Sequence, residues 1–379
     1  MKKTLALAFI AFSCALTAVE ITCEAPKDGF VRLGLRSELM SVEIVPQVSA
    51  LLGSWRHRPE NRELIGNLVC SRNETELLPT MFETNGIGGR ELIWKKRHFH
   101  NVPFQLLEAT SAPDSARLVL FNRYLMNENV EARKEITLRE GELKLSVIFT
   151  LTNRAKTTQQ MSLWTNLIAH LGPDNDYDTV VLPAKGGLKT TPVHRVMRLS
   201  SDQLYIDEDL GIREVFVAPA AHWLARYSRK RPGVLVIRTE PALLTDGVFY
   251  SYKRGPLSTT HTMEIVFPNR DFATNVPVAF PIDHLYFPHL TGISALCGDL
   301  ALHWEGTQMH CESAVPQDAT TMVITYLDKE GRELNQATLQ LPAMQTGKML
   351  TLKLAPPQGA VVIKGTLGKG SPFTILPTE

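Results

Sequence analysis

The sequence predicts an all-β protein with a large β-sheet domain followed by a smaller β-sandwich. The first observation is a series of short runs rich in β-branched and aromatic residues, which turn residues separate at intervals of roughly ten. The second is the lack of helical periodicity beyond the first residues of the chain. The third is a proline-rich stretch between Pro268 and Gly292 without clean alternation, after which the composition changes. We therefore predict domains at residues 19–290 and 291–379.

The N-terminal residues have the order of a secretory signal peptide. Lys2 and Lys3 are basic, residues 5–12 form an apolar run, and small residues follow up to Ala18. This run is shorter than the roughly 20 residues that a membrane-spanning helix needs. The alternative interpretation is a buried N-terminal helix. We expect cleavage of residues 1–18 and a periplasmic or secreted product.

Composition and charge exclude some classes of partner. Of the 379 residues, 44% are hydrophobic, which is enough to build ordinary cores. The chain carries 40 Lys and Arg residues against 39 Asp and Glu residues, without a basic stripe that could hold a phosphate backbone. No segment after residue 18 is apolar enough to cross a membrane. We expect no nucleic-acid partner and no membrane span.

Strand signals run through the first domain in order. Residues 117–124 are followed by a hairpin in which residues 132–138 and 142–152 flank the turn Arg139-Glu140-Gly141. Residues 234–239 and 262–267 show the same β-branched and aromatic character. Such short, evenly spaced strands are typical of a sandwich or a barrel.

The second domain reads as a small all-β module. Predicted strands cover residues 320–327, 333–341, 348–354 and 360–367, and the first two are separated by the turn residues 328–331. Its size and strand spacing resemble an immunoglobulin-like or fibronectin-like sandwich. No catalytic motif lies within it.

Four cysteines remain after the signal peptide, and an even number in an exported chain suggests disulfide bonds. Cys297 and Cys311 lie on two runs that look like neighbouring strands, so we predict a disulfide between them. A Cys23–Cys70 bond then follows by elimination. The alternative is four free, buried thiols.

The first candidate site follows a glycine-rich turn, residues 85–89. If residues 92–100 form a strand, then Trp94, His98 and His100 share one face. An indole beside imidazole groups suits sugar binding, because the ring covers the apolar face of a pyranose while polar groups bond its hydroxyls. The alternative is a turn followed by an edge strand with a solvated face.

The second candidate site is on the segment 161–170. Alternation places Trp164, Asn166 and His170 on one face and puts Leu163 and Leu167 on the core face. A tryptophan between polar neighbours on the face away from the core suits ligand contact. A purely structural tryptophan is the alternative.

The third candidate is Glu264. Met263, Ile265 and Phe267 make an apolar face, and Glu264 points the other way beside Thr262. A carboxylate on a rigid strand can act as a general base or bind hydroxyl groups. The alternative is an ordinary outward-facing glutamate.

Metal binding has one weak candidate. The run from Asp174 to Asp178 could offer oxygen ligands to Ca²⁺, but it lacks the rest of an EF-hand loop, which favours a solvated turn. The histidines have no regular ligand spacing, so we predict no zinc site.

Residues 30 to 290 resemble the galactose mutarotase-like superfamily, which includes the aldose 1-epimerases. Four segments carry the resemblance, and all lie within this range: residues 39–55, the segment Gly88-Gly89-Arg90-Glu91-Leu92-Ile93-Trp94, the strand end Leu151-Thr152-Asn153 with Ser162-Leu163-Trp164, and Met263-Glu264-Ile265. The resemblance implies a large, twisted β-supersandwich with a sugar site on its concave face.

The resemblance also implies roles for particular residues. Glu264 stands at the position of the catalytic base, and Arg90 at that of a substrate-binding arginine. Where the epimerases have a histidine acid soon after the Leu-Thr-Asn strand end, this chain has Trp164-Thr165-Asn166, so His170 or His98 would supply the acid.

Three functions follow from these residues. The first is an exported carbohydrate-binding protein whose sugar contacts come from Arg90, Trp94, His100, Trp164 and Asn166. The second is an epimerase-type isomerase that acts on a sugar or oligosaccharide, with Glu264 as base and His170 or His98 as acid. The third is a structural or adaptor protein of the cell envelope, whose sandwich modules hold partners.

Overall fold

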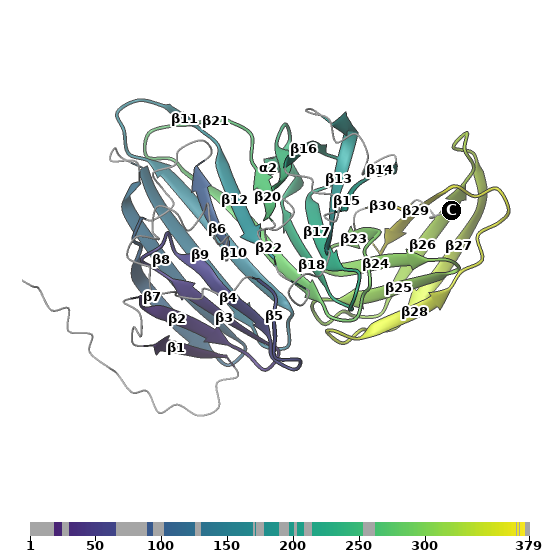
Figure 1. The fold of residues 1–379 in the computed structure, drawn as a ribbon, viewed down its shortest axis with the longest axis horizontal. Helices are drawn as coiled ribbons and strands as arrows, with labels where there is room; N and C mark the ends of the chain where they lie inside the picture. The colour runs from purple at the N-terminus through teal and green to yellow at the C-terminus, as the bar shows by residue number, and fades with distance from the viewer. Residues whose placement is uncertain are drawn as a thin grey trace, which may run out of the picture.

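The computed structural model describes residues 19–24, 30–65, 89–93, 102–125, 130–169, 171, 178–188, 197–200, 203–207, 214–252, 262–368, 370 and 372–375. Nearly all of these residues lie in β-strands or in the turns between them, and the one helix of the described part, α2 (Pro241–Leu244), has four residues. The predicted all-β class is confirmed (Figure 1). The predicted signal peptide lies outside the described residues.

One antiparallel sheet, called the first sheet here, contains the strands that later form the candidate site. Its order is β1-β2-β3-β4-β6-β12-β20-β19-β16, with the short β5 beside β4. The strands are β1 (Glu20–Glu24), β2 (Arg32–Arg36), β3 (Met40–Val45), β4 (Leu51–His57), β5 (Arg62–Glu63), β6 (Gly89–Ile93), β12 (Leu163–Ile168), β16 (Glu214–Pro219), β19 (Val248–Tyr252) and β20 (Thr262–Val266).

The second sheet is also antiparallel and has the order β7-β8-β9-β10-β22-β18-β17-β13-β15-β14. Its strands are β7 (Gln105–Ala112), β8 (Ser115–Leu125), β9 (Val130–Arg139), β10 (Lys144–Asn153), β13 (Asp178–Leu188), β14 (Met197–Ser200), β15 (Gln203–Asp207), β17 (Trp223–Ser228), β18 (Val234–Thr239) and β22 (Pro277–Phe287). The strand β13 also pairs with β16 and so joins the two sheets.

The predicted hairpin is confirmed as β9 and β10, which pair from Leu138↔Leu145 to Val130↔Asn153. Its turn contains Gly141 at φ 71°, a left-handed conformation that glycine adopts without steric cost.

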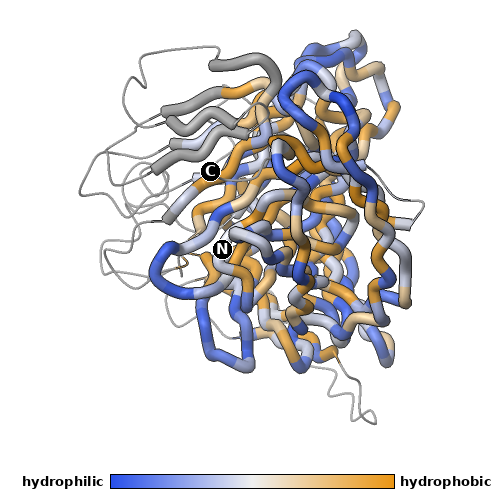
Figure 2. The backbone as a smooth tube through the Cα atoms, turned by 90° about the vertical axis from the view of Figure 1, so that its right-hand side faces the viewer, coloured by the Kyte–Doolittle hydropathy of each residue, from blue (hydrophilic) through white to orange (hydrophobic). Residues whose placement is uncertain are grey.

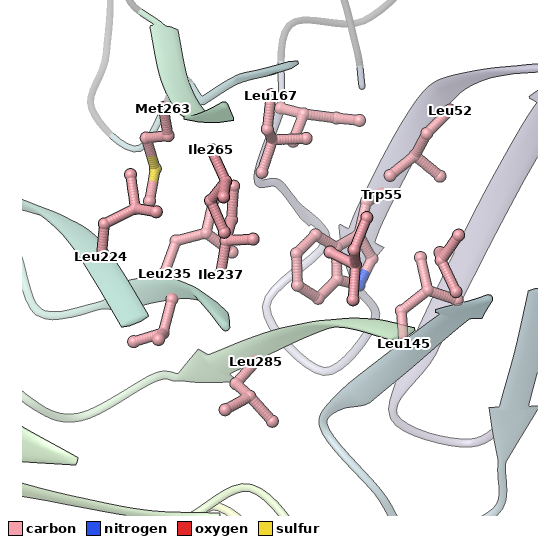
Figure 3. Close-up of a cluster of buried hydrophobic side chains, with 14 of the residues drawn as sticks. Leu52, Trp55, Leu145, Leu167, Leu224, Leu235, Ile237, Met263, Ile265 and Leu285 are labelled. Atoms are coloured by element: carbon pink, nitrogen blue, oxygen red, sulfur yellow. The ribbon is translucent and has the colours of Figure 1, made fainter. Parts of the chain in front are cut away.

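The two sheets pack face to face around the larger of two hydrophobic cores. Side chains that meet between the sheets include Trp55, Leu167, Met263 and Ile265 of the first sheet and Leu145, Leu224 and Ile237 of the second, all buried (Figure 3). Figure 2 shows hydrophobic residues along the inner strands and hydrophilic residues in peripheral turns. Leu167, Met263 and Ile265 point into this core, as the alternation predicted, while every residue of β12 and β20 is buried and so burial alone does not distinguish their two faces.

The C-terminal residues form a second sandwich of two four-stranded sheets. One sheet contains β23 (Ala295–Cys297), β24 (Leu300–Glu305), β25 (Gln308–Ser313) and β28 (Met349–Lys353), and the other contains β26 (Thr320–Leu327), β27 (Glu333–Leu341), β29 (Val362–Leu367) and β30 (Pro372–Ile375). Both enclose the smaller core, with Trp304, Tyr326 and Phe373 among its members. Ile293 and Ala301 nevertheless belong to the larger core, so the domain division at residue 290 stays a prediction.

Two short strands complete the fold. β11 (Gln159–Met161) and β21 (Arg270–Phe272) form a small sheet of their own. No helix in the described part of the chain has the length and apolar character that crossing a membrane requires.

The predicted disulfide between Cys297 and Cys311 is wrong, because both residues are free, buried thiols. Their strands β23 and β25 pair with opposite edges of β24, which separates them by two strand spacings, roughly 10 Å. A disulfide needs Cα atoms within about 7 Å. Burial raises the pKa of each thiol to about 12, and the neighbouring Cys311 also acts to raise the pKa of Cys297. Cys23 is a free, exposed thiol, and Cys70 lies outside the described residues.

Candidate functional site

Four adjacent strands of the first sheet bring sequence-predicted site residues into one line. The register of β6, β12, β20 and β19 places Arg90 opposite Asn166, Asn166 opposite Glu264, and Glu264 opposite Tyr250. Directly opposite residues of paired strands lie on the same face of a sheet. We call these four positions the central row. It lies on the outer face of the first sheet, since the residues that alternate with it face the core.

Glu264 and Trp164 are in direct contact within this site. The indole Nε1–H of Trp164 donates a hydrogen bond to Oε2 of Glu264. Both side chains are buried, with exposed fractions of 6% for Trp164 and 1% for Glu264. The bond occupies one acceptor position of the carboxylate and holds it in a defined orientation. Two residues that the sequence assigned to separate strands therefore act as one unit.

Asn166 is the unusual member of the central row. Its side chain is 1% exposed, and its Nδ2 atom has no hydrogen-bond partner among the described residues. A buried polar group is normally paired, and leaving one unpaired costs about 1–3 kcal/mol. The amide thus provides an unused hydrogen-bond donor on the residue directly opposite Glu264 in the sheet.

On the core side of the same strands lies a buried ion pair between the two sheets. Nζ of Lys134 on β9 is 2.6 Å from Oε2 of Glu91 on β6, and it also donates a hydrogen bond to the carbonyl oxygen of Ala50 at 2.9 Å. His284 lines the same space. Burial, and then the charge of Lys134, lower the pKa of His284 to about 3, so this imidazole is neutral at physiological pH.

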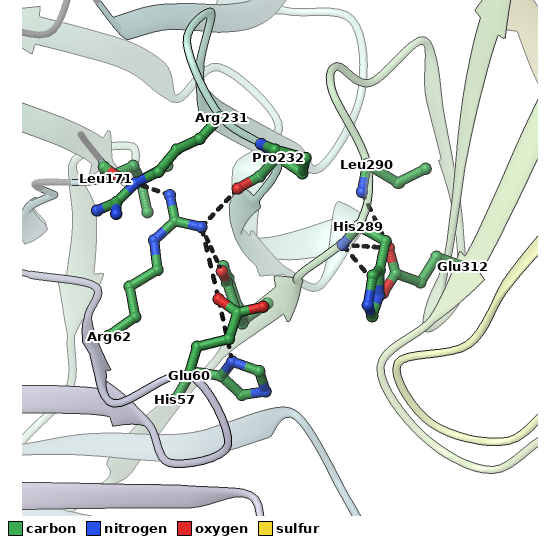
Figure 4. A network of polar contacts seen from close by, with 10 residues as sticks. His57, Glu60, Arg62, Leu171, Arg231, Pro232, His289, Leu290 and Glu312 are labelled. Carbon is green, nitrogen blue, oxygen red and sulfur yellow. Dashed lines mark hydrogen bonds and ion pairs between the residues drawn. The ribbon is translucent and has the colours of Figure 1, made fainter.

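A separate polar network lies beyond the end of β12 (Figure 4). The guanidinium of Arg62 donates hydrogen bonds to the Tyr286 hydroxyl at 2.9 Å and to the carbonyl oxygens of Pro232 and Leu171. Arg231 also donates to the Leu171 carbonyl, at 3.0 Å. These bonds satisfy buried carbonyl groups and join four segments, which gives the network a structural role.

The other predicted site residues lie wholly or partly outside the described part of the chain. His98, His100, Trp94 and His170 are not among the described residues, and of Arg90 only the backbone register is. Most of the proposed Ca²⁺ run, residues 174–177, is also outside. Within the described ranges no group of three or more His, Cys, Asp or Glu residues is placed to hold a metal ion.

Sequence reasoning missed Tyr250, Glu91 and Lys134. Tyr250 enters the row only through the pairing of β19 with β20, which no local pattern indicates. Lys134 did leave a signal, because it occupies an inward position of β9 whose alternate residues Ala132 and Ile136 are buried. A lysine in the apolar phase of a strand indicates a buried partner of opposite charge.

Sequence comparisons find no match: no protein-family model and no curated protein matches this chain. Solved structures do match its fold. A galactose mutarotase-like protein from Clostridium acetobutylicum superposes with a TM-score of 0.55 over 71% of this chain and 98% of its own, at 6% identity. A putative mutarotase from Salmonella typhimurium has a TM-score of 0.51 over 72% of this chain and 95% of its own, at 9% identity.

The chain has a galactose mutarotase-like fold. The superfamily resemblance that the sequence indicated is thereby confirmed at the level of the fold. A TPR-domain containing protein from Parabacteroides distasonis also matches, with a TM-score of 0.51 and 12% identity, over 69% of this chain. This chain spans 48% of that protein. At these identities the likeness concerns the fold alone, since one fold hosts many functions.

Proposed function

We propose that this chain is an exported carbohydrate-binding protein whose ligand site is the central row on the outer face of the first sheet. The observation that carries the proposal is the buried Asn166 amide, whose Nδ2 has no partner among the described residues and lies in register beside Glu264. A sugar hydroxyl can donate one hydrogen bond and accept another, so an amide donor on one strand and a carboxylate acceptor on the next strand suit it. Ligand sites typically use a few such precisely placed polar groups.

Export rests on the N-terminal sequence. The basic residues, the apolar run and the small residues of positions 1–18 have the order of a signal peptide. Cell fractionation of the full-length chain, followed by N-terminal sequencing of the mature product, tests this part. A product that keeps Met1 in the cytoplasm would contradict it.

Sugar binding is tested by calorimetry and thermal shift on the mature protein with a panel of mono- and oligosaccharides. We expect Asn166→Ala to weaken binding of any ligand about tenfold, which is the value of one net hydrogen bond. Glu264→Gln should weaken it more, because bonds to a charged group contribute about 1.5–3 kcal/mol. The matched control is Glu43→Gln, which changes a half-buried glutamate on β3 of the same sheet. Affinity equal to that of the unaltered protein in Asn166→Ala and Glu264→Gln would exclude this site.

A second candidate function is the structural or adaptor role. It is favoured by the burial of the central row, where Asn166, Glu264 and Tyr250 are only 1–8% exposed. Side chains this deeply buried offer little surface to a ligand. No binding across the whole panel would exclude the carbohydrate proposal and support this role.

A further measurement on any sugar that binds separates binding from catalysis. It follows the exchange between the anomers of that sugar by NMR. Acceleration that disappears in Glu264→Gln would establish an epimerase with Glu264 as its base, whereas binding without acceleration leaves a lectin-like protein.

A further inference from the structure

Lys134 is a buried cation in a position that the rest of its strand gives to apolar residues. Its side chain is 1% exposed. Within the described residues its ion-pair partner is the carboxylate of Glu91, whose side chain is 2% exposed. Replacing a buried ion pair by well-packed apolar residues is often neutral or stabilising. The best-attested use of such a pair is to specify register.

The strand β6 needs such a specification. It has five residues, Gly89-Arg90-Glu91-Leu92-Ile93, and its pairing with β4 consists of the single pair Leu52↔Gly89. A slip of one residue along β12 would move every residue of β6 to the opposite face. Ile93 faces the core in the observed register, and Leu92 would face it after a slip. The hydrophobic pattern of β6 therefore does not decide between the two registers.

The charges of β6 do decide. The observed register turns position 91 towards Lys134, and a one-residue slip in either direction would turn positions 90 and 92 to that face instead. That would bring the arginine and the lysine together between the sheets and leave both charges buried without a counter-charge, which costs several kcal/mol. Only the observed register gives the lysine a carboxylate.

We propose that Lys134 is a positioning residue that sets the register of β6 and so places Arg90 opposite Asn166 in the central row. The consequence for sugar recognition rests on the proposed function. The claim about the register of β6 does not depend on the proposed function, because the register can be measured without a ligand.

Disulfide trapping reports the register directly. Ile93 and Leu163 are directly opposite each other in the observed register, so Ile93→Cys/Leu163→Cys should cross-link under mild oxidation. Peptide mass spectrometry distinguishes this bond from bonds to native cysteines. Adding Lys134→Glu should abolish the cross-link, because the introduced carboxylate favours the slipped register with Arg90 inside. The charge exchange Lys134→Glu/Glu91→Lys should restore it.

Further variants separate the register effect from a general loss of folding. Lys134→Met removes the preference for the observed register of β6 and adds no new charge that would favour the slipped register. We therefore expect the cross-link yield to fall about twofold in protein that remains folded by circular dichroism. The control Lys144→Glu changes a lysine of the same sheet that pairs outward with Asp299 at 3.6 Å, and it should leave the yield unchanged. A full yield in folded Lys134→Met, or no recovery on charge exchange, would overturn the proposal.

The effect of Lys134 on sugar binding is measured separately. If the panel contains a binder, Lys134→Glu should weaken it about as much as Arg90→Ala, and the charge exchange should restore it. If the panel contains none, the proposed carbohydrate function fails while the cross-link result still decides the register.

Discussion

At the residue scale, the most informative contact is the hydrogen bond from the Trp164 indole to the Glu264 carboxylate. A buried carboxylate is costly unless donors surround it, so the indole helps to make Glu264 tolerable inside the site. Trp55 provides a contrast within the same fold, because it is fully buried and its Nε1 has no hydrogen-bond partner among the described residues. The two tryptophans thus differ in hydrogen bonding while both are buried.

We expect a coupling energy of about 1.5–3 kcal/mol between Trp164 and Glu264, the value of a hydrogen bond to a charged group. A double-mutant cycle with Trp164→Phe and Glu264→Gln, measured by urea unfolding, gives this number. The control is a second cycle with Trp55→Phe and Glu264→Gln, and its coupling energy should be near zero. Equal coupling in the two cycles would show that the indole acts through its volume alone.

At the element scale, the end of β10 shows how one side chain fastens two strands. Asn153 is fully buried, and its Nδ2 donates to the carbonyl oxygens of Thr157 and Phe272, each at 2.8 Å. Its Oδ1 accepts a hydrogen bond from the Ala155 amide at 2.9 Å. The asparagine therefore closes the turn after β10 and attaches it to β21.

We expect Asn153→Ala to lower the free energy of unfolding by about 2–4 kcal/mol, because it removes three hydrogen bonds and leaves the partner groups of the buried residues Ala155 and Phe272 unpaired. Urea unfolding of the full chain measures the loss. Asn269→Ala is the control, since Asn269 is exposed and makes one long contact, 3.4 Å, with Gln160. A loss below 1 kcal/mol in Asn153→Ala would mean that water replaces these bonds.

At the scale of the whole molecule, polar contacts join the two sandwiches across the outer face of the second sheet. Arg238 on β18 bridges Asp283 of the same sheet at 2.8 Å and Asp299 of the C-terminal sandwich at 2.7 Å. Glu312 on β25 accepts hydrogen bonds from the backbone amides of His289 and Leu290, just after β22 (Figure 4). The contact between the sandwiches is therefore specified by charge as well as by packing.

The Arg238 bridge makes the stability depend on pH. Burial acts to raise the pKa of Asp283, but the charge of Arg238, with hydrogen bonds from Arg238 and Ser146, lowers it below its usual value. A lowered pKa in the folded state stabilises the protein above the unfolded-state pKa of about 3.9, and this stabilisation is lost as the pH falls through the folded-state pKa.

We expect Asp283→Asn to reduce stability at pH 7 and to differ progressively less from the unaltered protein below about pH 4. Urea unfolding as a function of pH measures this difference, with Asp271→Asn, an exposed aspartate on β21, as the control. A difference that stays constant down to pH 2 would show that Asp283 contributes through packing and not through its charge.

The sequence by itself determined the properties that depend on local periodicity. Alternation predicted that Leu167, Met263 and Ile265 face the core, because a strand turns successive side chains to opposite faces. A glycine-containing turn predicted the β9–β10 hairpin. The order and spacing of these strands were also sufficient to indicate the mutarotase-like fold.

The tertiary structure alone decided which strands are neighbours. It separated Cys297 from Cys311 by inserting β24 between their strands, added Tyr250 to the central row, and joined Lys134 to Glu91 across the two sheets. Strand order brings together residues that are far apart in the chain, and a local pattern with a period of two residues carries no information about the partner strand. The candidate site is built from such non-local pairs, so its composition became visible only in the folded molecule.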